Sequence, residues 1–210
     1  MTTAWIAGAS GLVGGELLRL LLADPAFDEV VSVGRRTLAV ASPKLTQLTV
    51  DFADPGSFES LDAADVAFSC LGTTIKKAGS TEAFRAVDHG AVLAFARAAR
   101  SKGAKVFVHV SSLGADRASR SFYASVKGEV EEDLAALGYE TMVALRPSIL
   151  DGDRAESRPL ERVGLAFARA LGPVLGKYRP TEASAVARAM VAKAKAREPG
   201  AQVVDAAAIT

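Results

Sequence analysis

The sequence has very few residues that bind metal ions or cross-link the chain. It contains one cysteine, Cys70, two histidines, His89 and His109, and no asparagine. A single cysteine excludes an internal disulfide framework and indicates a reducing compartment. With only these three soft ligands, we do not expect a closed zinc site.

Charge and hydrophobicity both argue against nucleic acids and membranes as partners. The 25 Lys and Arg residues nearly balance the 24 Asp and Glu residues, which leaves a net charge of +1. No global field therefore attracts nucleic acid or an anionic membrane. No apolar run is long enough to cross a membrane, and the first ten residues lack the basic and apolar parts of a signal peptide. We expect a cytoplasmic protein without an integral membrane segment.

Short β-rich runs alternate with helical patterns along the 210 residues. Strands are expected at 4–7, 30–33, 45–50, 65–70, 105–110 and 141–145, helices at 11–23, 81–102 and 123–137, and a loop at 72–80. This order predicts an α/β fold, a Rossmann-like doubly wound parallel sheet with right-handed crossovers. We expect one domain over residues 1–210. Its part from Ser148 onward would form a small C-terminal cap, at about 148–180, and a final strand.

The first expected strand runs into the glycine-rich sequence GASGLVG, residues Gly8–Gly14. Gly8 permits a tight turn, Gly11 lets the backbone approach a pyrophosphate, and Gly14 lets the next helix pack closely on the sheet. The free N–H groups and the positive end of that helix then face the phosphates. A strand before the motif and a helix after it are the context that a dinucleotide site requires. A glycine-rich turn without a ligand is the alternative.

The end of the second expected strand indicates which nicotinamide cofactor is bound. An NAD site usually has a carboxylate there for the ribose 2′-hydroxyl, whereas this chain has Arg35 and Arg36. Guanidinium groups suit a 2′-phosphate and can stack on adenine, so NADPH is favoured. A solvated basic turn is the alternative. Asp51, after the third strand, either accepts from the adenine amino group or simply ends its strand.

The sequence YASVK places Tyr123 and Lys127 one helical turn apart, on the same face of a helix. An ammonium near a phenol favours phenolate, so Tyr123 could exchange a proton with a carbonyl or alcohol oxygen. Ser112 follows the fifth expected strand and could donate a hydrogen bond to the same oxygen, with Ser111 as the second choice. The alternative is a half-buried tyrosine beside a lysine that extends to solvent.

Taken together, the motifs resemble a known family. GASGLVG, Y-x-x-x-K and the strand-ending Ser-Ser pair are similar to the short-chain dehydrogenase/reductase superfamily. The sequences VGRR, DF, CLGTT, SSLGAD, YASVKGEVE and RPSILDGDRAESRP resemble more narrowly its atypical group, which contains the human Tat-interactive protein oxidoreductase and its bacterial relatives. The resemblance extends over most of the chain.

The resemblance implies a Rossmann fold, bound NADPH, and Tyr123 as proton donor or acceptor. By position, it implies cofactor contacts at Ser10, Gly11, Leu12, Val13, Arg35, Arg36, Cys70, Leu71, Tyr123, Lys127, Leu150 and Arg158. The wider superfamily also uses an asparagine that connects the lysine to solvent protons, and this chain has none. The proton relay would then pass through water or a backbone carbonyl, or turnover would be slow.

The sequence therefore predicts an NADPH-dependent oxidoreductase for a small carbonyl or alcohol substrate, in which Lys127 and Ser112 assist Tyr123. A regulatory or scaffold protein that binds NADPH with little turnover is the main alternative, and it would have a protein partner. A homo-oligomer is compatible with both hypotheses. An epimerase or dehydratase is disfavoured, because the region after Ser148 is too short to hold a nucleotide sugar.

Overall fold

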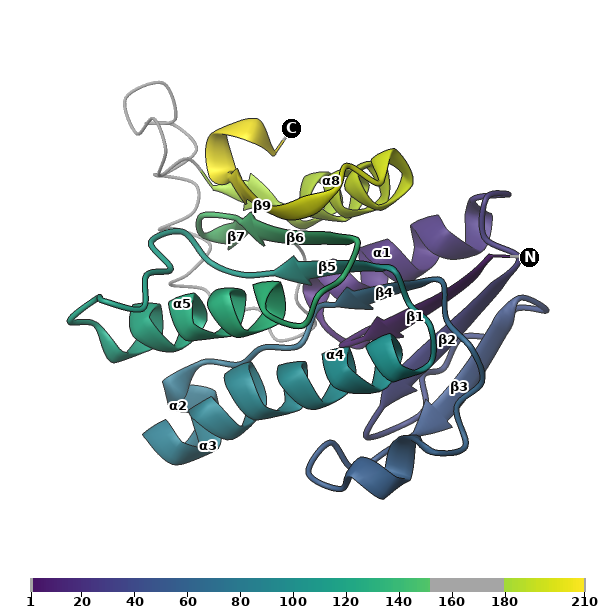
Figure 1. Cartoon of the computed structure of the whole chain (residues 1–210), viewed down its shortest axis with the longest axis horizontal. Helices are drawn as coiled ribbons and strands as arrows, with labels where there is room; N and C mark the ends of the chain where they lie inside the picture. Colours follow the sequence, from purple (N-terminus) through teal and green to yellow (C-terminus); the bar gives the residue numbers. More distant parts are fainter. Residues whose placement is uncertain (1, 152–179, 210) are drawn as a thin grey trace.

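A computed structural model of the chain describes residues 2–151 and 180–209, and these residues build a seven-stranded parallel sheet (Figure 1). Its order is β3-β2-β1-β4-β5-β6-β9. The strands are β1 Thr3–Ala7, β2 Glu29–Gly34, β3 Leu45–Thr49, β4 Val66–Ser69, β5 Val106–Val110, β6 Thr141–Arg146 and β9 Gly200–Asp205. The predicted Rossmann-like fold is confirmed. The chain reverses its direction of progress between β1 and β4, where open α/β sheets bind their ligands.

The central strands are mostly apolar and almost entirely buried, because both of their faces are covered. Every residue of β4 and of β5 is buried, as are four of the five residues of β1. Buried, mostly apolar runs of this kind are typical of parallel strands between two helical layers. The edge strands β3 and β9 are more exposed.

Helices cover both faces of the sheet (Figure 1). One face carries α1 (Leu12–Ala23) and α8 (Ala183–Ala196), whose buried residues share a core with Ile6 and Phe68. The other face carries α4 (Val92–Ser101) and α5 (Phe122–Ala135), which pack around Trp5 and Phe107. Short 3-10 turns occur at Pro55–Phe58 and Ala206–Ala208.

The helix predicted at 81–102 is continuous but not uniform. It begins as α3 (Thr81–Arg85), passes through the π-helical turn η2 (Ala86–Ala91) and continues as α4. The Ser80 hydroxyl caps its start by accepting from the Ala83 N–H at 3.0 Å. A π-turn inside a longer helix is frequent at functional sites. The loop predicted at 72–80 also contains a short helix, α2 (Ile75–Ala78).

The C-terminal part agrees with the sequence prediction in one respect and differs in another. The expected final strand is present as β9, which pairs with β6. Helix α8 was not predicted and covers the sheet beside α1. Leu150–Asp151 (β7) and Thr181–Glu182 (β8) form a second, two-stranded parallel sheet. Most of the cap predicted at 148–180, including Arg158, lies outside the described residues.

Candidate functional site

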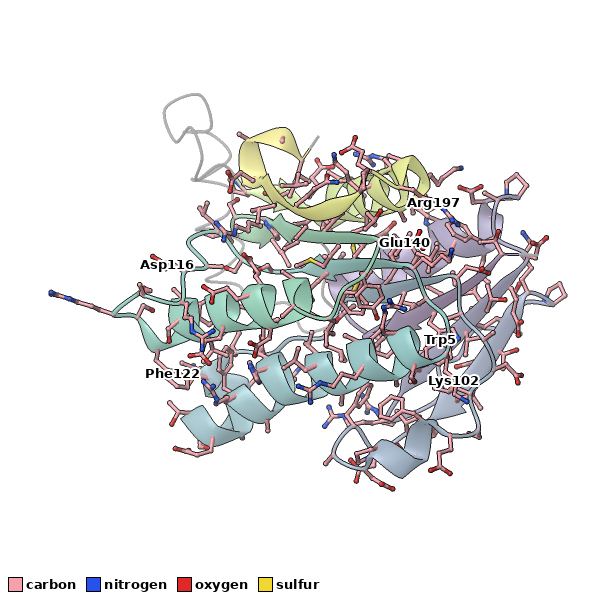
Figure 2. The ribbon with its side chains drawn as sticks, viewed as in Figure 1. Trp5, Lys102, Asp116, Phe122, Glu140 and Arg197 are labelled. Atoms are coloured by element: carbon pink, nitrogen blue, oxygen red, sulfur yellow. The ribbon has the colours of Figure 1, made fainter. Side chains whose placement is uncertain are left out.

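Most of the predicted site residues that the structure describes lie near the carboxyl end of the sheet. Because all strands are parallel, the residues that follow β1, β2, β4 and β5 emerge at the same end. In Figure 2, Asp116 and Phe122, which flank the connection from β5 to α5, lie on this side. Lys102 and Arg197, at the ends of helices that lead into β5 and β9, lie on the opposite side.

The glycine turn after β1 touches the end of β4. Gly8 has a φ of 85°, in the left-handed region that favours glycine. A Cβ on Gly8 would lie 2.5 Å from the Cys70 carbonyl oxygen and 2.8 Å from the Leu71 nitrogen. A Cβ on Gly14 would lie 2.1 Å from the Gly8 carbonyl oxygen. The two glycines therefore let the turn, the start of α1 and the end of β4 make direct backbone contact.

The start of α1 fits a pyrophosphate. Its N-cap residue is Gly11, whose own N–H donates to the Gly8 carbonyl oxygen at 2.9 Å. Among the described residues no side chain caps this helix, and its first turn contains no acidic residue. Helix N-terminal N–H groups without a capping acceptor bind anions well, because the helix dipole is positive there. The adjacent Ser10 is exposed.

Two neighbouring glycines of α1 offer a matched test of this packing. Gly14→Ala should destabilise the protein by about 1–3 kcal/mol, since its methyl group would collide with the backbone of the turn. Gly15→Ala should be neutral or slightly stabilising, because its nearest neighbour would be the Ala9 carbonyl oxygen at 3.7 Å. Chemical denaturation of both variants measures the difference. Equal stabilities would contradict the contact between α1 and the turn.

Arg35, Arg36 and Asp51 follow β2 and β3 at this end and are exposed. Within residues 2–151 and 180–209, neither guanidinium group forms an ion pair. Asp51 Oδ1 accepts a hydrogen bond from the Ala53 N–H at 2.9 Å, so part of this carboxylate stabilises its own turn. Both arginines are therefore available to a ligand.

Tyr123 and Lys127 lie close together on α5. The Lys127 ammonium is 6.0 Å from the centre of the Tyr123 ring, and the Phe84 ring lies 5.4 Å from the same ring. The Lys127 side chain is only 5% exposed, so it does not extend to solvent. Its Nζ lies 2.7 Å from Oδ1 of Asp88, which is fully buried in the π-turn η2.

Sequence analysis missed Asp88, although a signal was present. Asp88 follows Phe84 by four residues and precedes Val92 by four, and both of these residues are buried. Positions four apart lie on one face of a helix, so Asp88 belongs to the apolar face of its helix. A charged residue on such a face requires a partner or a function.

The structure distinguishes the two serines that follow β5. Ser111 is buried, and its hydroxyl donates to Glu131 Oε1. Glu131 is itself paired with Arg146, at 2.6 Å between Nη2 and Oε2. Ser112 is half-buried, and among the described residues its hydroxyl has one long contact, at 3.4 Å, with the Leu113 carbonyl oxygen. Ser112 is therefore the more available hydroxyl.

The loop that carries these serines is held against α5. The Asp116 N–H donates to the Ala124 carbonyl oxygen at 3.1 Å. Gly128 lies below the same loop, where a Cβ would be 2.1 Å from the Arg117 nitrogen. Any larger residue at this position would displace the loop and with it Ser112.

Cys70 and His109 are not suited to acid–base or nucleophilic roles at neutral pH. Burial raises the pKa of the Cys70 thiol to about 12, and its Sγ lies 3.9 Å from the Met190 sulfur. Burial, and next the charge of Lys127, lower the pKa of His109 to about 3, against a weaker opposite effect of the Ser69 backbone. His109 is therefore neutral. Neither ring nitrogen has a hydrogen bond of standard geometry within the described chain.

Two negative findings apply to the described ranges. None of their helices is both long and apolar enough to cross a membrane. They also contain no cluster of three or more His, Cys, Asp or Glu side chains that could hold a metal ion.

Solved structures share the fold. MoeE5 in complex with UDP-glucuronic acid and NAD superimposes with a TM-score of 0.74 at 21% identity, over 96% of this chain and 75% of that one. A short-chain dehydrogenase family protein from Francisella tularensis gives a TM-score of 0.70 at 15% identity, over 99% and 98% of the two chains. At these identities, the likeness shows the fold alone.

A curated relative corrects the predicted location. Protein fmp52, mitochondrial, from Aspergillus fumigatus is 40% identical over 206 residues, which span 91% of this chain and 86% of the relative. This protein and others similar to the chain are named mitochondrial, so the prediction of a cytoplasmic protein is wrong. The single cysteine supported that prediction, but it does not distinguish one reducing compartment from another.

The family itself is shown by a match over most of the chain. A family model described as NAD(P)H-binding matches residues 8–197, from the glycine turn to the end of α8. This range includes the motifs on which the predicted resemblance was based. The chain belongs to this NAD(P)H-binding family, is similar to proteins named fmp52, and shares the Rossmann-like fold of short-chain dehydrogenase structures.

Proposed function

We propose that the protein is an NADPH-dependent oxidoreductase that acts on a carbonyl or alcohol group of a small substrate. The observation that carries this proposal is the buried Lys127 ammonium beside Tyr123. A buried charge is costly even when it is paired, and buried titratable groups beside one another are frequent at functional sites. We further propose that residues 1–210 form one NAD(P)-binding domain, with a substrate cap at about 148–180.

The proposed cofactor site follows the carboxyl end of the sheet. It consists of Gly8, Ser10, Gly11, Leu12, Val13 and Gly14 for the pyrophosphate, Arg35, Arg36 and Asp51 for the adenosine half, and Cys70, Leu71, Tyr123, Lys127, Leu150 and Arg158 for the nicotinamide half. The close backbone approach of Gly8 to Cys70 supports a continuous surface between the pyrophosphate group and the nicotinamide group.

In the proposed reaction, a nicotinamide held beside Tyr123 and Lys127 would supply or accept the hydride. The Tyr123 phenol donates a proton to the substrate carbonyl oxygen during reduction and takes it back during oxidation. Ser112 donates a hydrogen bond to the same oxygen and so orients the substrate. Lys127 stabilises negative charge on the Tyr123 oxygen.

The preference for NADPH is tested at Arg35 and Arg36. Each charge-assisted hydrogen bond to the 2′-phosphate contributes about 1.5–3 kcal/mol, so NADPH should bind at least about tenfold more tightly than NADH. Replacing both arginines with alanine should remove most of this difference in affinity between NADPH and NADH. Isothermal titration of both proteins with both cofactors measures it. Equal affinities in the unmutated protein would show that the pair is only a basic turn.

A second candidate function is that of a regulatory or scaffold protein that binds NADPH with little turnover. The Lys127–Asp88 ion pair favours it, because a carboxylate beside the ammonium offsets the charge that would stabilise phenolate at Tyr123.

A further inference from the structure

Lys127 and Asp88 form the most deeply buried ion pair of the described chain. The ammonium and the carboxylate are 5% and 0% exposed, and 2.7 Å separates Lys127 Nζ from Asp88 Oδ1. Burying an ion pair costs the hydration free energy of both charges, and such a pair often stabilises a fold less than an apolar pair of similar size would. Stability alone is therefore a weak explanation for its presence.

Both oxygens of Asp88 are held in place. While Oδ1 faces the ammonium, Oδ2 accepts a hydrogen bond from the Thr73 N–H at 2.7 Å. The neighbouring Gly72 leaves the space that this arrangement needs, since a Cβ there would be 3.3 Å from Asp88 Oδ1 and 3.7 Å from Lys127 Nζ. The carboxylate thus links the loop after β4 to the lysine of α5.

The π-turn places Asp88 at this junction. Its residues Ala86–Ala91 interrupt the regular helix on either side, and the turn contacts α5 directly. A π-turn inserts one residue into a helix and so redirects the side chains within it. The ion pair is consequently built by a local irregularity of the helix at the carboxyl end of the sheet.

We infer that Asp88 is a positioning residue, which holds the Lys127 ammonium beside Tyr123 and within reach of the nicotinamide ribose. This inference rests on the proposed function and assigns to Asp88 the place that the wider superfamily gives to its asparagine. The Asp88 side chain differs from that asparagine in charge. A carboxylate both orients the ammonium and partly neutralises it, whereas an amide would only orient it.

Binding of NADPH to four variants tests the positioning role without a substrate. Lys127→Met should weaken NADPH binding at least about tenfold, through loss of a charged hydrogen bond. Asp88→Ala should cause a similar loss, because the ammonium is no longer fixed. Asp88→Asn should recover part of the affinity that Asp88→Ala loses, since its amide oxygen can face Lys127 while its NH2 group then faces the Thr73 N–H. Asp88→Ala combined with Lys127→Met should bind no worse than Lys127→Met alone.

Asp133→Asn is the matched control, because it also removes a carboxylate that joins η2 to α5. Asp133 Oδ2 lies 2.8 Å from His89 Nε2, and its side chain is 40% exposed. NADPH affinity should not change in this variant. Unchanged affinity in Asp88→Ala, with a loss in Lys127→Met, would overturn the positioning role alone. Unchanged affinity in Lys127→Met would overturn both this role and the proposed use of Lys127 at the cofactor.

Asp88→Asn also tests the effect of the carboxylate charge. Its side chain has nearly the size of aspartate, so this variant remains informative if Asp88→Ala does not fold. The titratable groups that face Lys127 are Asp88 from η2, Tyr123 from α5 and the neutral His109 from β5. Removing the carboxylate leaves the ammonium charge unopposed. The pH profile of alcohol oxidation should therefore rise at a pH lower by about one unit. An unshifted profile would overturn the electrostatic part of the inference.

Discussion

Tyr123→Phe should lower turnover by about 10²–10⁴ and leave NADPH affinity within about threefold. The phenylalanine ring preserves packing against Phe84, whose ring lies 5.4 Å away, and removes only the hydroxyl. The proposed reaction needs that hydroxyl for proton transfer, whereas cofactor binding depends mainly on the glycine turn, the arginines and Lys127. Steady-state kinetics together with NADPH titration separate the two effects.

Tyr139→Phe is the matched control for this loss. Tyr139 is buried at the opposite end of the sheet, before β6, and its hydroxyl donates to the Ala96 carbonyl oxygen at 2.5 Å. Removing this hydroxyl should reduce stability by about 0.5–1.5 kcal/mol and leave turnover unchanged. Similar turnover in Tyr123→Phe and Tyr139→Phe would show that Tyr123 does not transfer the proton.

Acid should destabilise the protein through His109. The folded protein holds the pKa of His109 at about 3, below its usual 6.5, chiefly because burial disfavours the charged ring. Between these two pH values the unfolded chain binds more protons than the folded one, so stability is complete above pH 6.5 and falls as the pH is lowered. Each pH unit inside the window is worth about 1.4 kcal/mol, which gives a loss of roughly 2–3 kcal/mol between pH 7 and pH 4.5.

His109→Gln isolates this contribution, since glutamine is neutral at every pH in the window. Between pH 7 and pH 4.5, the free energy of unfolding should fall by about 2–3 kcal/mol more in the parent protein than in His109→Gln. His89→Gln replaces the other histidine, which lies near the surface beside Asp133, and controls for the change of residue type. Parallel pH dependences of the parent and His109→Gln would contradict a neutral, buried His109.

The parallel sheet was predictable because burial on both faces leaves a strong mark on the sequence. The strands β1, β4 and β5 are short, mostly apolar runs, and their glycine and serine neighbours mark the carboxyl end. Helix α8 was not predicted, since it is rich in alanine, which packs against α1 without the large apolar side chains that make a helical period visible.

The candidate site was predictable where it depends on local spacing. Tyr123 and Lys127 are one turn apart on a helix, so their proximity follows from the sequence. The partner of Lys127 does not, because Asp88 comes from a different helix and reaches the ammonium only through the packing of η2 on α5. Sequence analysis preferred Ser112 to Ser111, and the structure adds a physical reason for that preference, since it pairs Ser111 with Glu131.

The central claim is that this chain oxidises NADPH with a carbonyl substrate through Tyr123. NADPH absorbance should be followed while the purified protein is incubated with a panel of aldehydes, ketones and quinones, in parallel with Tyr123→Phe. At least one compound should oxidise NADPH faster than the solvent background, and that excess should be lost in Tyr123→Phe. NADPH that binds but is consumed no faster than background with every compound, or equally fast in both proteins, would contradict the account.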